Sequence, residues 1–170
     1  DTTVLATAFS PSDEEIKTKK HLHSIKVLSR IKKKENKGYT SYLNIVEFIG
    51  VLSEKSNKSA SFIEEKVELI EKDFGVNIIY PSYRVPIDYE FEKTSDALQW
   101  LLKEWTNDVK KISVEYRLGG LDASHLLTAI ENECTRFITW DRDFLRNPNL
   151  EQKRIKELKY IQITSPAIIT

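Results

Sequence analysis

The sequence lacks several features that mark specialised classes of protein. It has no methionine and one cysteine, Cys134, in 170 residues. A lone cysteine cannot form a disulfide within the chain, which suits a reducing cytoplasm, and we interpret Cys134 as a packed thiol rather than a nucleophile. No run of about 18 apolar residues is present, so no transmembrane helix is predicted. No charged-then-apolar leader is visible either. We therefore expect a cytoplasmic protein without a membrane partner.

An excess of charge of one sign is also missing. The chain has 26 basic and 26 acidic residues and a net charge of +0, so its overall field does not steer it onto nucleic acid. The charge is nevertheless uneven, because residues 17–37 hold nine Lys or Arg and one acid. Within this stretch Lys32, Lys33 and Lys34 are candidates for binding RNA phosphates, which would make binding salt-dependent. The alternative is an ordinary solvated helix face.

Glycine is scarce, and the five glycines form no phosphate-binding loop. Hydrophobic periodicity instead predicts helices that alternate with short β-rich runs. Strands separated by helices indicate a parallel sheet covered on both faces. The expected helices are 12–35, 43–55 (capped by Thr40 or Ser41), one from Ser59 or Ser61 to Gly75, 94–112, a short one after Asp122, and 150–157. The expected strands are 76–80, 135–139 and 159–164.

Four acids stand where such a sheet would place a site, because ligands bind beyond the carboxyl ends of parallel strands. Asp141 directly follows an apolar strand, and Asp122 follows a Gly-Gly turn at a helix start. Both can equally be helix caps. Glu47 lies in an otherwise apolar helix, where a carboxylate needs either a cleft or a Lys or Arg partner. Asp1 would end a strand if one preceded it, and is otherwise an exposed terminus.

Several carboxylates in one cleft repel each other unless a cation offsets their charge. Mg²⁺ and Mn²⁺ prefer oxygen ligands. Such ions support attack of water on a phosphodiester. If the fold gathers these acids, the sequence therefore indicates a site for a hard divalent cation.

Four segments, taken in order, resemble the PIN-domain family of VapC-like, metal-dependent ribonucleases: the opening DTT, IVEF, GGLDASHLLTA and FITWDRDF. The resemblance covers most of the chain. It implies a three-layer α/β/α fold with a parallel sheet of about five strands. It also implies Mg²⁺ or Mn²⁺ as cofactor and hydrolysis of RNA by water. Many members are toxins of toxin–antitoxin pairs, and others process ribosomal RNA. The resemblance therefore leaves two roles open, a toxin with an antitoxin partner or an RNA-processing enzyme, and a homodimer is expected.

Carried onto this chain, the resemblance assigns roles residue by residue. Thr3 and Thr139 would orient a ligand or water, and Asp143 would be an auxiliary acid. His125, close to Asp122 in the sequence, is a further candidate that would donate to a phosphate or to Asp122. The alternative is a histidine at a helix start whose hydrogen bonds are satisfied within the protein. The expected metal ligands, which are also the catalytic residues, are Asp1, Glu47, Asp122 and Asp141.

Two departures from the family pattern accompany these expectations. The family's central first strand precedes its first acid, so we expect that strand upstream of residue 1. Residues 1–170 would then be a single domain, with 54–112 as a helical elaboration that covers the site or forms an interface.

Two other functions stay open: a PIN-like module that binds RNA or protein without cleavage, and a phosphatase of the haloacid dehalogenase type. The latter needs a second Asp at the place of Thr3.

Overall fold

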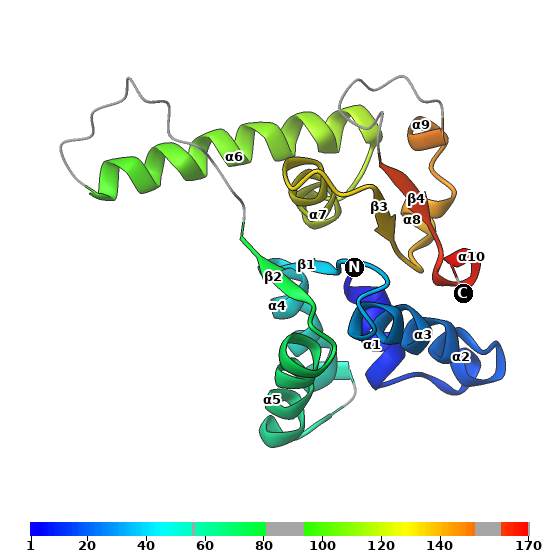
Figure 1. Ribbon diagram of the computed structural model, residues 1–170. Helices are drawn as coiled ribbons and strands as arrows, with labels where there is room; N and C mark the ends of the chain where they lie inside the picture. Colours follow the sequence, from blue (N-terminus) through cyan, green and yellow to red (C-terminus); the bar gives the residue numbers. More distant parts are fainter. Residues whose placement is uncertain (56, 81–93, 152–160, 170) are drawn as a thin grey trace.

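The computed structural model describes residues 1–55, 57–80, 94–151 and 161–169, and helices dominate it (Figure 1). The elements from the first part of the chain are α1 (Thr2–Phe9), α2 (Asp13–Lys17), α3 (Lys20–Lys32), β1 (Tyr39–Ser41), α4 (Tyr42–Gly50), the π-helical turn η1 (Val51–Lys55), α5 (Ala60–Glu68), a second π-helical turn η2 (Leu69–Asp73) and β2 (Asn77–Ile79). The remaining elements are α6 (Thr94–Tyr116), α7 (Gly120–Glu131), β3 (Arg136–Ile138), α8 (Arg142–Leu145), α9 (Pro148–Glu151), β4 (Gln162–Thr164) and α10 (Pro166–Ile169).

The structure corrects the expected helix over 12–35, which is two helices, α2 and α3. Between them Lys19 has φ of 59° in the left-handed region, so the helix cannot continue through it. The start of α2 is set by a capping box, in which the Ser12 hydroxyl accepts from the Glu15 N–H and the Glu15 carboxylate accepts from the Ser12 N–H.

Other helix predictions are confirmed in type and adjusted in extent. Ser41 caps α4 and Ser59 caps α5, and each of these helices runs on into a π-helical turn. Gly75 ends the second of them with φ of +67°, a conformation that glycine adopts without a steric penalty. The helix expected over 94–112 is α6 and extends to Tyr116.

The remaining elements differ more. Helix α1 and strand β1 were not expected. The helix expected over 150–157 is described only as far as residue 151, within α9, and its other residues lie outside the described part. The last strand, expected over 159–164, is described from residue 161, and β4 covers Gln162–Thr164.

The expected three-layer fold with about five parallel strands is wrong. The four described strands form two separate two-stranded parallel sheets, β1 with β2 and β3 with β4. A cavity of about 550 Å³ is lined by residues from both β1 and β3. Within the described residues, no backbone ladder joins the two sheets.

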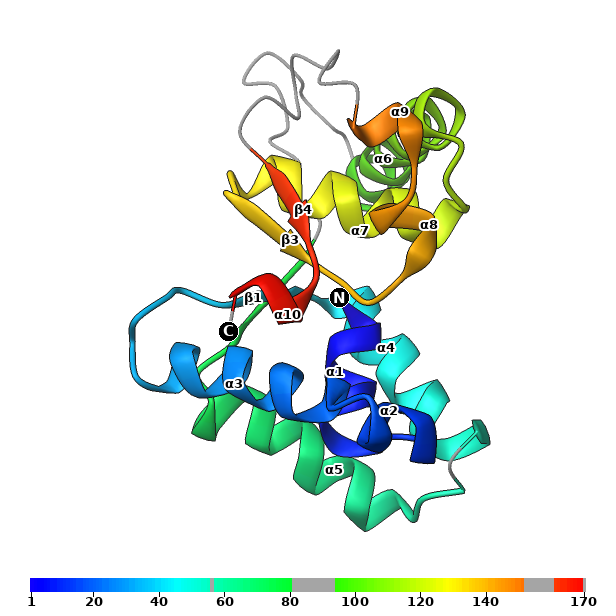
Figure 2. The same cartoon turned by 90° about the vertical axis from the view of Figure 1, so that its right-hand side faces the viewer.

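Each sheet belongs to its own hydrophobic core. The lower half of the molecule in Figure 1 contains β1, β2 and helices α1 to α5, and its core includes the fully buried Phe48, Leu52 and Ile70. The upper half contains β3, β4 and helices α6 to α9, and its core includes Leu126 and Phe137. The start of the chain lies where the two halves meet (Figures 1 and 2).

Among the described helices, none is both long enough and apolar enough to cross a membrane.

Candidate functional site: a cluster of carboxylates between the two halves

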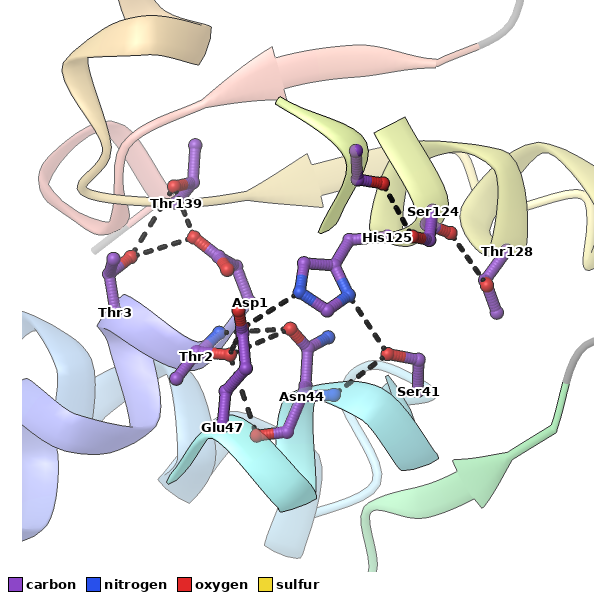
Figure 3. A network of polar contacts seen from close by, with 11 residues as sticks. Asp1, Thr2, Thr3, Ser41, Asn44, Glu47, Ser124, His125, Thr128 and Thr139 are labelled. Atoms are coloured by element: carbon purple, nitrogen blue, oxygen red, sulfur yellow. Dashed lines mark hydrogen bonds and ion pairs between the residues drawn. The ribbon is translucent and has the colours of Figure 1, made fainter. Parts of the chain in front are cut away.

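Asp1 is held by two threonine hydroxyls (Figure 3). Its carboxylate oxygen Oδ2 accepts from the Thr3 hydroxyl at 2.8 Å and also from the Thr139 hydroxyl. The Thr139 oxygen in turn accepts from the backbone N–H of Asp141 at 2.8 Å. One hydroxyl therefore links the carboxylate of Asp1 to the backbone of Asp141, which lies 140 positions later in the sequence. This places the loop after β3 against the start of α1.

Glu47 projects from α4 toward α7 and has two hydrogen-bond donors. Its Oε2 accepts from the Thr2 hydroxyl at 2.6 Å and lies 2.8 Å from Nε2 of His125. Among the described residues, the partner of Glu47 is therefore a histidine and not the Lys or Arg of the alternative interpretation. The contact joins α4 in the first core to α7 in the second (Figure 3).

His125 is buried, with 3% of its surface exposed. Its Nδ1 lies 3.2 Å from the hydroxyl of Ser41, which also accepts from the Asn44 N–H. Because a carboxylate only accepts hydrogen bonds, Nε2 carries the proton toward Glu47 and Nδ1 accepts from Ser41. Burial lowers the pKa of His125, against the opposing effect of the Glu47 carboxylate. The expectation that His125 donates to a phosphate or to Asp122 is thus replaced by a contact with Glu47.

Asp122 lies in the first turn of α7, whose N-cap is Gly119 rather than Asp122. The pKa of Asp122 is raised to about 6, first by burial and then by the charges of Asp141, Glu47 and Asp143. Burial and like charges both disfavour the ionised form of a carboxyl group, so the two causes act in the same direction on Asp122. Because Gly119 is the N-cap of α7, the alternative that Asp122 is an ordinary helix cap is wrong.

Asp141 is a helix cap, as its alternative interpretation held, because its Oδ1 accepts from the Asp143 N–H at 2.7 Å at the start of α8. Capping uses one carboxylate oxygen and leaves the other available. Asp143 itself is exposed. In the described part of the chain, no Lys or Arg forms an ion pair with Asp1, Asp122 or Asp141.

The donor set matches a hard cation in chemistry, because all four predicted ligands offer carboxylate oxygens. In the arrangement described, no three Asp, Glu, His or Cys side chains lie close enough together to hold a metal ion. Like charges without a cation hold carboxylates apart. Ion binding at this cluster would therefore require the side chains of Asp122 and Asp141 to close on Asp1 and Glu47.

The basic run at the end of α3 is not brought to the carboxylates. Lys32 lies over the ring of Phe74, 5.9 Å from its centroid, and Lys33 and Lys34 end the helix. The other end of the same helix does approach the site, because Lys20 lies 5.3 Å from the ring centroid of Trp140. Sequence reasoning missed Lys20 and Trp140 as site residues, although Trp140 stands directly before Asp141.

A scan of the sequence against models of known protein families finds no match. A search of curated proteins likewise finds no related sequence. The functional argument consequently depends on the residues and geometry described above.

Proposed function

We propose that this protein is a metal-dependent endoribonuclease that hydrolyses RNA phosphodiester bonds with Mg²⁺ or Mn²⁺. One arrangement carries the proposal: acids from four separate segments of the chain come together where the two halves meet. Thr139 links Asp1 to Asp141. The charges of Asp141 and Glu47 add to burial in raising the pKa of Asp122. Like charges in one cluster repel each other, and binding of a divalent cation would offset their charge. The resemblance of Asp1, Glu47, Asp122 and Asp141 to the four acids of PIN-domain ribonucleases supports the same function.

The proposed roles follow from how each side chain is held. Asp1 is oriented by Thr3 and Thr139, and Glu47 by Thr2 and His125, so two ligands are positioned before any ion binds. Asp122 and Asp141 complete the ligand set from the other half of the molecule. When bound, the ion would supply an activated water and offset charge on the phosphate. His125 acts through Glu47 and is a positioning residue.

Finer features of the proposal concern partners. A toxin role, with an antitoxin as partner, is supported by the resemblance, and growth arrest that a neighbouring gene product relieves would test it. A homodimer is supported by three exposed apolar side chains on one face of α4, namely Tyr42, Val46 and Ile49. Sedimentation equilibrium would test the dimer.

The first experiment is cleavage of a labelled single-stranded RNA by the wild-type protein in Mn²⁺ and in EDTA. Asp141→Asn should lower the rate by at least about 100-fold, because a ligand carboxylate is lost. Glu64→Gln, an exposed acid on α5, is the matched control and should cleave at the wild-type rate.

Two results would contradict the proposal. Equal cleavage by Asp141→Asn would mean a contaminating nuclease or a different site. Absence of cleavage together with absence of Mn²⁺ binding by calorimetry would leave the alternative, a module that binds RNA or protein without cutting it.

A further inference from the structure

A second pocket, also of about 550 Å³, opens beside the carboxylate cluster. Its wall is built by residues of α1, α2, η1 and the connection between α1 and α2, with Lys20 from the start of α3 and Trp140 from the loop after β3. Helices α1, α2 and α3 lie together in Figure 2. A pocket of this size is within the range that holds a small organic ligand. It is distinct from the cavity between β1 and β3.

The pocket is continuous with the cluster through Thr3. The Thr3 side chain lines the pocket, and its hydroxyl donates to the Asp1 carboxylate and accepts from the backbone N–H of Trp140 at 3.0 Å. Trp140 also lines the pocket and is flanked in sequence by Thr139 and Asp141. A ligand in the pocket would therefore lie directly next to a phosphate held at the carboxylates.

Three side chains give the pocket its chemical character. The Lys20 ammonium lies over the Trp140 ring, and the indole N–H of Trp140 donates to the Ser24 hydroxyl at 2.8 Å, which fixes the ring. Glu15 is held on the wall by the Thr7 hydroxyl at 2.6 Å and by Ser12. The pocket thus combines a cation, an aromatic ring and a hydrogen-bond acceptor.

A nucleotide presents the complementary groups. Its phosphate pairs with an ammonium, its base stacks on an indole, and its sugar hydroxyls and base amines donate to a carboxylate. Stacking on a side chain requires a base that is not already stacked in a duplex, which selects single-stranded RNA.

We propose that this pocket binds the nucleotide adjacent to the cleaved bond in single-stranded RNA, with Lys20 against its phosphate and Trp140 against its base. This inference rests on the proposed ribonuclease function and names the substrate class of the same site.

Binding of a fluorescein-labelled six-nucleotide RNA, followed by anisotropy in EDTA, tests the pocket without cleavage. Lys20→Gln should weaken binding about fivefold and lower the slope of log affinity against log salt by about one, because one phosphate contact is lost. Lys26→Gln, an exposed lysine on the same helix that lines neither pocket, is the matched control and should bind as the wild type does. Trp140→Leu, with its fold checked by circular dichroism, should weaken binding about tenfold.

The same RNA in a duplex should bind at least about tenfold more weakly, since its bases are already stacked. If Lys20→Gln and Lys26→Gln change RNA affinity equally, or if the duplex binds as tightly as the single strand, the proposal that this pocket binds a nucleotide is contradicted. Cleavage in Mn²⁺ is scored separately. If the protein binds RNA through Lys20 but does not cut it, the proposed nucleotide pocket is supported and the proposed nuclease activity is contradicted. If the protein cuts RNA and Lys20→Gln leaves its affinity unchanged, the nuclease activity is supported and the pocket is contradicted.

Discussion

Hydroxyl groups hold the two carboxylates that come from the first half of the chain. Thr3 and Thr139 donate to Asp1, and Thr2 donates to Glu47. A hydroxyl orients a carboxylate without neutralising it, whereas a Lys or Arg would compete with an incoming cation. The pattern therefore preserves negative charge in a defined place, which is what a cation site requires.

The raised pKa of Asp122 makes stability depend on pH. This carboxyl has a pKa of about 6 in the folded protein against an ordinary value of 3.8. Its contribution to stability is therefore fully present below about pH 4 and is lost as the pH rises through about 6. A shift of two units corresponds to about 3 kcal/mol, and solvent screening at this half-buried side chain reduces it to about 1 kcal/mol.

Asp122→Asn, which cannot ionise, should therefore be about 1 kcal/mol more stable than the wild type at pH 7. The difference should disappear toward pH 4. Urea unfolding in EDTA at the two pH values measures it. If Asp122→Asn is less stable than the wild type at pH 7, the claim that the ionised Asp122 carboxylate destabilises the folded protein is contradicted.

The two neighbouring glycines offer a matched pair of substitutions at the same carboxylate. A Cβ at Gly119 would lie 3.3 Å from Oδ2 of Asp122, whereas a Cβ at Gly120 meets nothing within 4 Å. The backbone at Gly119, with φ of −59° and ψ of 156°, is one that alanine adopts freely. Gly119→Ala should therefore displace the Asp122 carboxylate by a few tenths of an ångström without unfolding the turn.

We expect Gly119→Ala to lower the rate of Mn²⁺-dependent cleavage about threefold. Gly120→Ala should leave that rate unchanged. Initial cleavage rates of the two variants and the wild type, measured on the same RNA substrate, test this difference. An equal effect of both substitutions would indicate that the turn, rather than the position of Asp122, controls activity.

At the scale of elements, the boundary between α2 and α3 depends on one strained residue. Lys19 has φ of 59° and ψ of 17°, a conformation that costs a residue with a side chain about 1–2 kcal/mol. Glycine removes most of that cost in the folded protein. It also increases the conformational entropy of the unfolded chain, which offsets part of the gain in stability. Lys19→Gly should therefore stabilise the protein by about 0.5–1 kcal/mol.

Lys26 lies in the interior of α3 and supplies the contrast. Lys26→Gly should destabilise the protein by about 1 kcal/mol, as glycine does inside a helix. Thermal unfolding of both variants measures whether each substitution raises or lowers the stability of the protein. Destabilisation by both would mean that α2 and α3 do not depend on this turn.

At the scale of the whole molecule, two small sheets with separate cores meet at a cavity and at the carboxylate cluster. In the described structure, β1 and β3 each pair with a single neighbour, so each leaves one strand edge without a backbone partner. Edge groups of this kind exchange their amide hydrogens readily.

We expect amide hydrogens of residues 39–41 and 136–138 to exchange on the order of ten times faster than those of α7, which packs in the second core. Hydrogen exchange followed by mass spectrometry measures this at the level of peptides. Protection of both strands equal to that of α7 would show that their edges are covered in solution, contrary to the separation described.

The sequence by itself determined the local features of this protein. The caps at Ser41 and Ser59, the stop at Gly75 and the presence of the helix that is α6 depend on neighbours within a few residues, so pattern and propensity predict them. The same reasoning selected Asp141 and Glu47, whose charges contribute, after burial, to the raised pKa of Asp122.

Only the tertiary structure decided how distant segments meet. Whether strands join in one sheet or two depends on backbone hydrogen bonds between segments far apart in the chain, and periodicity carries no information about that pairing. The pairing of Glu47 with His125, the link from Asp1 through Thr139 to Asp141, and the pocket formed by Lys20 and Trp140 likewise join residues that no spacing relates. The site's residue types are thus a property of the sequence, whereas its contacts are a property of how the two halves pack.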